Sequence, residues 1–239
     1  MKRKNQIGII VCMALTFFSA EIWASSVPDT GQTKCYDDVG NVITCTSPGQ
    51  AFYGQDANYL INPNAFVKMD AAGKDLASNI TTWAMVRDTA TGLVWESKNK
   101  ADGTKDYTNP HDTDNTYTWY DPDPTTNGGN AGVEGDGTDT FDLITALNQI
   151  GFGGYTDWRI PSREELRSIV DYSRFGPAIN KTYFPLTVSN VYWTANTSTY
   201  FGKAWGVNFY DGSDGGYGGN VYAGNKYCDY YVRAVRGGQ

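Results

Sequence analysis

The run Asp157-Trp-Arg-Ile-Pro-Ser-Arg-Glu-Glu-Leu166 constrains the fold of this chain more than any other segment. It holds a complete start signal for a helix. The hydroxyl of Ser162 can cap the first turn after a proline, and Glu165 follows three residues later to complete a capping box. Three apolar residues at the spacing of one helix face follow: Leu166, Ile169 and Val170. The segment therefore predicts a helix packed on a hydrophobic core.

Another helix is expected before that run, over residues 140–150. Five apolar residues recur there at helical spacing, with three on a central stripe and two at its edge: Phe141, Ile144 and Leu147, then Leu143 and Ile150. Asp139 or Thr140 is the expected N-cap, and Gly151 is the expected stop. We expect this helix to pack against a sheet.

Strands are predicted on both sides of the helices, because aromatic and β-branched residues gather there. Residues 83–88 and 93–95 flank a glycine-containing turn and predict a hairpin. Three more segments predict strands after the helices: 191–194, 203–209 and 230–236. This order indicates an α+β fold, with two helices packed on mainly antiparallel strands and long loops between them.

Five segments carry a resemblance to a known family. They are Thr91-Gly-Leu-Val-Trp95, Asp157–Leu166, Tyr192-Trp-Thr194, Ala204-Trp-Gly-Val207 and Tyr231-Val-Arg-Ala-Val-Arg-Gly237. In this order they resemble the motifs of the Lcl C-terminal domain family, a bacterial domain formerly of unknown function. The likeness covers about residues 82–238, and residues 30–38 and 49–56 are similar to the lead-in of many secreted members.

The resemblance implies a C-type-lectin-like fold, related in shape to the formylglycine-generating-enzyme domain. The named member of the family is the C-terminal part of a bacterial collagen-like adhesin that binds sulfated glycans. The fold carries over from the resemblance, but the ligand does not, because one fold hosts many functions. Four tryptophans in the motifs are expected to be structural: Trp95, Trp158, Trp193 and Trp205.

The chain is expected to have three parts. Residues 1–24 are read as a secretory signal peptide, because basic residues precede an apolar run too short to span a bilayer; an uncleaved anchor is the alternative. Residues 25–81 form an extended N-terminal segment, with a predicted Cys35–Cys45 disulfide whose pairing spacing alone does not prove. Residues 82–239 form the domain. The protein is thus expected to be secreted, periplasmic or at the cell surface, and not an integral membrane protein.

Charge excludes one class of partner. Removing residues 1–24 takes away three basic side chains and one acidic one, which moves the formal charge from −7 to −9. A chain this acidic repels phosphate backbones, so nucleic acid is not an expected partner. Arg159 and Arg233 are expected to form internal contacts. Cys228 is interpreted as a small buried hydrophobe on a strand, without a neighbour that would activate its thiol.

The expected binding surface lies in the loops between the C-terminal strands. Tyrosine rings with a polar edge suit sugars and protein partners alike, and acidic and amide side chains accompany them there. The candidate residues are Tyr200, Tyr210, Asp211, Asp214, Tyr217, Asn220 and Tyr222. Calcium is the single candidate cofactor, at Asp136 and Asp139. The competing interpretation of that segment is a solvated acidic loop in which Asp139 caps the helix.

Catalysis is not the favoured function. The chain has one histidine, His111, so a Ser/His/Asp triad would have to be built on it. The first hypothesis is a recognition or adhesion module that binds an extracellular glycan or protein, with carbohydrate binding as one form. The alternatives are a modifying factor related to the formylglycine-generating enzyme, and a structural component of an envelope or appendage complex. Ligand identity and oligomeric state do not follow from the sequence.

Overall fold

A computed structural model describes residues 28–210 and 218–238 of the chain. The predicted signal peptide, residues 1–24, lies outside the described residues. The described part contains two α-helices and three antiparallel sheets joined by long loops, which confirms the α+β class. Neither helix in this part of the chain has the length and apolar character needed to cross a lipid bilayer.

The first large sheet has four antiparallel strands in the order β3-β4-β5-β9. Their bounds are Phe66–Met69, Met85–Asp88, Val94–Glu96 and Val235–Arg236. The predicted hairpin is confirmed as β4 and β5, closed by a hydrogen bond of 2.8 Å from the amide of Gly92 to the carbonyl of Asp88. The φ angle of Gly92 is 75°, a left-handed conformation that glycine adopts without strain.

Both faces of this sheet are covered. Met85 and Val94 belong to a core cluster that also contains residues of α1, while Val86 and Trp95 belong to a second cluster with residues of α2. Because neighbouring residues of a strand point to opposite faces, a continuous apolar run is what such a strand requires. The run around Trp95 is therefore explained by burial on two sides.

The second large sheet has the order β6-β7-β8, with bounds Val191–Thr197, Lys203–Asn208 and Val221–Asn225. Strands β6 and β7 confirm two predicted strands, whereas β8 was not predicted. The prediction of a strand over residues 230–236 is correct only for β9. Before β9, Tyr230 bridges Tyr117 and Tyr231 bridges Tyr192, so the chain changes its pairing partner as it passes between the sheets.

Helix α1 (Thr140–Gln149) begins where expected, and Ile144 and Leu147 pack on the core as predicted, but the buried face is rotated toward Thr140. Leu143 and Leu147 are buried with Thr140, while Phe141 and Ile150 are exposed. The reason is a polar anchor. The hydroxyl of Thr140 donates to the carbonyl of Tyr120 at 2.9 Å and accepts from its amide at 3.0 Å, which turns the Thr140 side of the helix inward.

Helix α2 (Arg163–Ser168) has the predicted capping box. The hydroxyl of Ser162 accepts from the amide of Glu165 at 3.1 Å, and the carboxylate of Glu165 accepts from the amide of Ser162 at 2.8 Å. Leu166 and the two apolar residues that follow the helix are buried, as the spacing predicts. Arg159 donates two bonds of 2.7 Å to the carboxylate of Glu165, so its internal role is confirmed.

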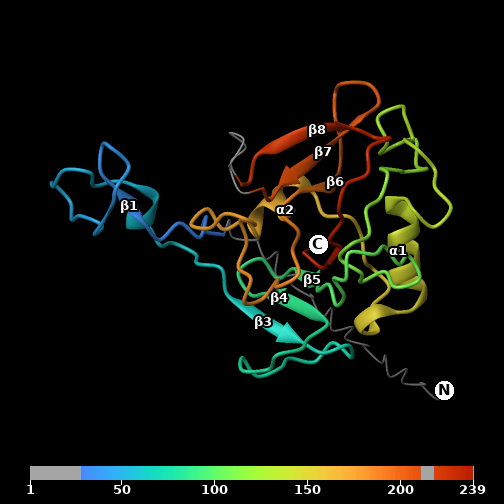
Figure 1. Cartoon of the computed structure of the whole chain (residues 1–239), viewed down its shortest axis with the longest axis horizontal. Helices are drawn as coiled ribbons and strands as arrows, with labels where there is room; N and C mark the ends of the chain where they lie inside the picture. Colours follow the sequence, from blue (N-terminus) through green and yellow to red (C-terminus); the bar gives the residue numbers. More distant parts are fainter. Residues whose placement is uncertain (1–27, 211–217, 239) are drawn as a thin grey trace, which may run out of the picture.

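The N-terminal segment forms a small lobe that Figure 1 shows set apart from the body of the molecule. We call residues 33–60 the disulfide lobe. It contains β1 (Cys35–Tyr36), β2 (Val42–Ile43) and the 3-10 helix η1 (Asp56–Asn58), and the predicted Cys35–Cys45 disulfide joins it. A domain boundary at residue 82 stays a prediction. Strand β3, which precedes that residue, is already part of the four-stranded sheet.

The long region 97–139 is irregular, as expected, yet it is held by many local bonds. Its Asp and Asn side chains repeatedly accept hydrogen bonds from the amide two residues on, as Asp106 does from Thr108 and Asp123 from Thr125. Such Asx turns replace a strand ladder with contacts that each residue makes locally. A second 3-10 helix, η2 (Phe152–Gly154), follows α1.

Candidate functional site

The described candidate binding residues divide between the two ends of the three-stranded sheet. Tyr200 is exposed in the turn between β6 and β7. Tyr210, Asn220 and Tyr222 lie toward the opposite end: the amide of Asn208 donates to the carbonyl of Asn220 at 2.9 Å, and Tyr222, which is exposed on β8, pairs with Gly206. Asp211, Asp214 and Tyr217 lie outside the described residues. The structure therefore does not bring the described candidates into one site.

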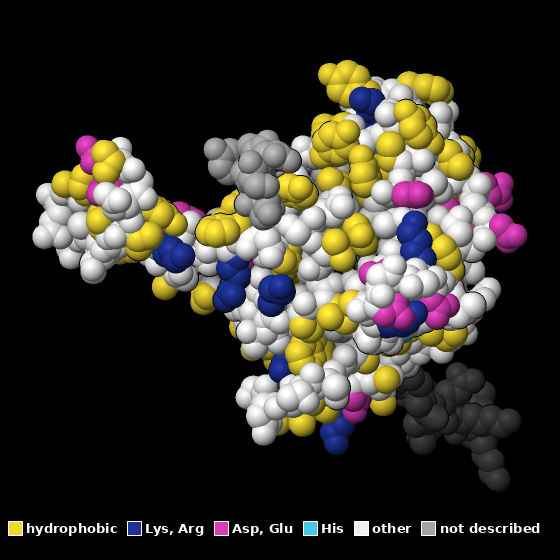
Figure 2. Space-filling model, in the orientation of Figure 1, with side chains coloured by type: hydrophobic (Ala, Val, Ile, Leu, Met, Phe, Trp, Pro, Cys, Tyr) yellow, Lys and Arg dark blue, Asp and Glu magenta, His cyan; other side chains and the backbone are white. Residues whose placement is uncertain are grey.

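An aromatic surface lies at the end of the sheet that contains Tyr200. Three rings there are largely exposed: Tyr200 at 67%, Phe201 at 80% and Tyr227 at 68%. They come from two turns, which a hydrogen bond of 3.0 Å from the amide of Lys226 to the carbonyl of Gly202 holds together. Figure 2 shows hydrophobic side chains gathered over the β6–β7 turn, at the top of the view. We call these three residues the aromatic end.

Polar groups accompany these rings. The ammonium of Lys203 lies 5.9 Å from the centre of the Tyr200 ring, and the side-chain amide of Asn225 donates to the hydroxyl of Tyr227 at 3.0 Å. Rings with hydrogen-bonding edges can stack on the C–H face of a sugar or pack against a protein. The aromatic end is therefore suited to binding, and it holds no group placed for bond-breaking chemistry.

Tyr222 belongs to a different surface of the same sheet. Its ring lies 6.1 Å from that of Tyr230, and Tyr230 in turn packs at 4.7 Å on the buried ring of Trp193. Burial raises the pKa of Tyr230. Tyr222 thus extends a row of core aromatics to the surface.

The sequence prediction missed Phe201 and Tyr227. Both lie within turns, Phe201 beside Gly202 and Tyr227 after Lys226, where a large ring has no strand face to pack on. That context was a usable signal, because an aromatic residue in a turn is more exposed than one on a strand. The burial of the motif tryptophans agrees with their predicted structural role, since Trp95, Trp158 and Trp193 are buried and Trp205 is half-buried.

Ionisable groups are concentrated in the core, around Glu96. One oxygen of its carboxylate lies 2.9 Å from the ammonium of Lys98 and 3.0 Å from Nδ1 of His111. The other oxygen accepts from the amide of Ala234 at 3.1 Å. Arg233 donates to the backbone carbonyl of Glu96 at 2.7 Å, which confirms its internal role. Glu96 is fully buried and the side chain of His111 is 13% exposed, so this network lies almost entirely inside the fold and supports it.

The calcium candidates take different positions. Asp136 is exposed, whereas Asp139 is buried and is the N-cap of α1. Its two oxygens accept from the amides of Asp142 and Gly135, each at 2.8 Å. Burial raises the pKa of Asp139, and these bonds oppose that effect. The geometry thus accounts for Asp139 as a capping residue, and calcium binding at Asp136 and Asp139 stays a prediction.

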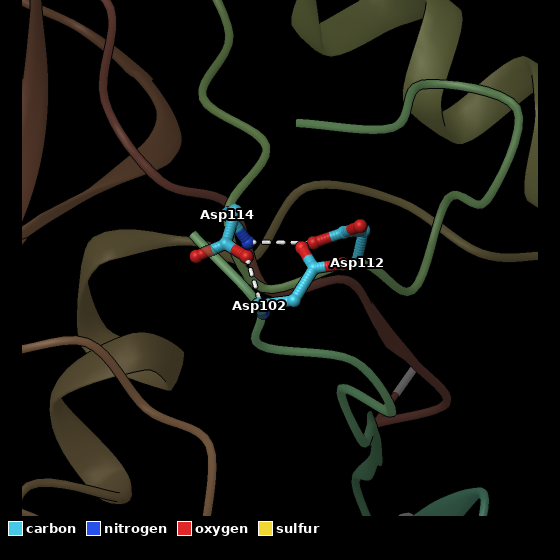
Figure 3. Close-up of side chains that lie close together, drawn as sticks. All are labelled: Asp102, Asp112 and Asp114. Atoms are coloured by element: carbon cyan, nitrogen blue, oxygen red, sulfur yellow. Dashed lines mark hydrogen bonds between the residues drawn. The ribbon is translucent and has the colours of Figure 1, made fainter. Parts of the chain in front are cut away.

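Within the described residues, three carboxylates lie close enough together to hold a metal ion, and they belong to other residues: Asp102, Asp112 and Asp114. Figure 3 shows the three side chains pointing toward one another across the loop. The ammonium of Lys100 already lies among these acids, 2.8 Å from Asp112 and 3.5 Å from Asp102. Asp114 accepts from the amides of Asp102 and Gly103 at 2.9 and 2.8 Å. The group therefore orders the loop around a lysine.

Cys228 is not on a strand, contrary to the prediction. It lies in the bend after β8, half-buried and packed against the first core cluster, and it is the free cysteine of the described residues. The strand prediction was wrong because β8 ends at Asn225, where Lys226 turns the chain back.

Comparison with known proteins agrees with the motifs. The family model of the Lcl C-terminal domain matches residues 84–236, from the start of the β4–β5 hairpin to the end of β9. No curated protein sequence matches this chain. The match covers more than half of the chain and includes both helices and both large sheets, and so the chain belongs to the Lcl C-terminal domain family.

Proposed function

We propose that this protein is a secreted or surface-exposed recognition module that binds a glycan or a protein through its aromatic end. Its family is one of bacterial extracellular domains. The observation that carries the proposal is the exposure of Tyr200, Phe201 and Tyr227 together at one end of the three-stranded sheet. Each such ring offers about 150–250 Å² of surface that a ligand can cover.

Binding fits this surface better than catalysis does. The strongest concentration of interacting charges, around Glu96, is buried, and the histidine belongs to it. The aromatic end instead offers flat rings, one ammonium group and one amide. Aromatic anchors with hydrogen-bonding edges commonly contribute most of the binding free energy at interfaces.

The expected ligand is a neutral glycan or a protein. A polyanion would need several cations at one place, whereas at the aromatic end the ammonium of Lys203 lies near Tyr200 and the neighbouring Lys226 is buried. The acidic balance of the whole chain opposes a sulfated glycan further. This protein is therefore not expected to share the ligand of the named adhesin.

A glycan array and a pull-down from bacterial envelopes test the proposal together, each with and without calcium. The test variants are Tyr200→Ala, Phe201→Ala and Tyr227→Ala. Phe175→Ala is the matched control, because Phe175 is 75% exposed and lies in the loop after α2. We expect each test variant to weaken binding about tenfold or more, and the control to bind as the unaltered protein does.

The outcomes separate the hypotheses. Array binding that depends on the three rings supports a glycan ligand, and envelope capture alone supports a protein partner or a structural role in the envelope. If the unaltered protein shows neither array binding nor envelope capture, recognition through this surface is refuted. A tightly bound metal together with a reactive Cys228 thiol would instead favour the formylglycine-related modifying factor.

A further inference from the structure

Two short segments connect the disulfide lobe to the body, and together they form a stalk, residues 28–32 and 61–65. The amide of Asp29 donates to the carbonyl of Asn62 at 2.8 Å, so the two segments run side by side. The stalk is fastened to the chain after α2, where the amide of Tyr172 donates to the carbonyl of Thr30 at 3.1 Å. The position of the lobe therefore depends on how firmly the stalk is held.

A cavity of about 170 Å³ lies where the stalk meets the body. Its lining includes the carboxylates and carboxamides of Asp29 and Asn64 from the stalk and of Asp171 and Asn180 from the body, beside the hydroxyl of Thr33. The approach is close because Gly31 has a φ angle of 76°, and a Cβ there would lie 3.1 Å from the carboxylate of Asp171.

Two of these oxygens are buried without a hydrogen-bond partner among the described residues: Oδ2 of Asp29 and Oδ1 of Asn64. The other oxygen of Asp29 accepts from the amide of Thr30 at 2.8 Å. The side-chain nitrogen of Asn64 donates to the carbonyl of Ser168 at 3.3 Å, which determines which atom of that amide is left over. Buried acceptors without a partner destabilise a fold unless water or an ion meets them.

We infer that this cavity is a calcium site in which Oδ2 of Asp29 and Oδ1 of Asn64 are ligands. Carboxylate and carboxamide oxygens are the ligands that Ca²⁺ prefers, and backbone carbonyls and water complete its shell of six to eight. The charge of Asp171 is already balanced by Arg174 at 2.6 Å. Asp29 thus supplies the charge that the ion neutralises.

The size of the cavity supports an ion over a larger ligand. A volume of about 170 Å³ is smaller than the roughly 300–1,000 Å³ of pockets for small organic molecules. It suffices for an ion with a few waters, and the same space could hold water alone. Calcium would link the stalk to the body and thereby fix the disulfide lobe.

The test uses the mature chain, freed of metal by a chelator. It is titrated with CaCl₂ or MgCl₂ in a calorimeter to measure the heat of binding, and its thermal unfolding is measured with and without each salt. We expect saturable calcium binding with a Kd of about 10⁻⁴–10⁻³ M, as in extracellular modules, and an increase in Tm. Magnesium should bind more weakly, because it demands a tighter octahedral shell.

Three variants make the test specific to the site. Asp29→Asn should weaken calcium binding at least about tenfold, because it removes the charged ligand. Asn64→Ala should also weaken it, because it removes the second ligand oxygen. Asp38→Asn, at an exposed acid of the lobe, should leave it unchanged.

Failure of the unaltered protein to respond to calcium overturns the inference and leaves the cavity to water. The same holds if Asp29→Asn responds as the unaltered protein does, because the ion would then be bound elsewhere. Should Asp29→Asn not fold, calcium binding by Asn64→Ala decides the question: unchanged affinity overturns the inference. An aromatic-end variant tests the proposed function independently, since it leaves the stalk intact.

Discussion

The ammonium nitrogen of Lys98 lies 2.9 Å from the carboxylate of Glu96, and both side chains are almost entirely removed from solvent. Glu96 ends β5 and Lys98 follows two residues later, so the two side chains place opposite charges side by side in the core. The carboxylate also meets His111 and the amide of Ala234, so every partner loses its hydrogen bond or its charge balance if Glu96 is changed.

Replacement of Glu96 by Gln should lower the free energy of unfolding by about 3 kcal/mol, because Lys98 would remain buried without a counter-charge. Urea denaturation at neutral pH measures the change. Glu164→Gln is the matched control, since Glu164 pairs with Arg163 at an exposed site and should cost less than about 1 kcal/mol. Equal costs for the two variants would contradict the assigned role of the buried pair.

The same carboxylate predicts a dependence of stability on pH. The charges of Lys98 and His111 lower the pKa of Glu96 to about 2, against the desolvation that burial imposes. Because the folded pKa is lower than the ordinary value of 4.5, its contribution is complete above about pH 4.5. It is lost as the pH falls toward 2, and this lowering corresponds to about 3 kcal/mol.

Comparison with Glu96→Gln isolates this effect, because the variant lacks the titrating group. Denaturation series from pH 5 to pH 2.5 should show a difference between the two proteins that shrinks as the pH falls. A difference that stays constant throughout that range would show that Glu96 is not held ionised by its neighbours.

Replacement of Ser162 by Ala should reduce stability by about 1 kcal/mol, because the amide of Glu165 would lose its capping acceptor. The Arg159–Glu165 pair should persist, since it does not involve the hydroxyl. Ser78→Ala, at an exposed residue outside any helix, serves as the control. Equal unfolding midpoints for the two variants would mean that the capping bond contributes nothing.

Replacement of Lys226 by Met should loosen the loop over residues 127–130. The ammonium of this buried lysine lies 3.9 Å from the Trp119 ring and donates to the carbonyls of Asn127, at 2.9 Å, and Asn130. Methionine keeps the packing of the stem but removes both bonds, at a cost of about 2 kcal/mol.

Hydrogen exchange measures this effect directly. The amide of Asn130, which donates to the carbonyl of Asn127, should exchange faster in the Lys226→Met protein. Replacement of the exposed Lys34 by Met should leave that amide as protected as before. Unchanged protection in both variants would show that the lysine does not hold the loop.

The candidate site was only partly readable from sequence. Tyr200 and Tyr222 are exposed as expected, because aromatic residues near turns and strand ends have little to pack against. The separation of Tyr200 from Tyr222 was not predictable, because it depends on the pairing of β7 with β8, and β8 was not predicted from the sequence. The lack of hydrogen-bond partners at the side-chain oxygens of Asp29 and Asn64 was not predictable either, because their cavity forms between the stalk and residues more than a hundred positions away.

Local chemistry determined the parts of this protein that sequence alone could give. The capping box of Ser162 and Glu165, the β4–β5 hairpin and the Cys35–Cys45 loop each depend on residues close in the chain. Tertiary structure decided which face of α1 is buried, where Glu96 finds its partners and which aromatics reach the surface. Those outcomes depend on contacts between distant segments, and residue type alone does not specify which polar groups will meet once water is excluded.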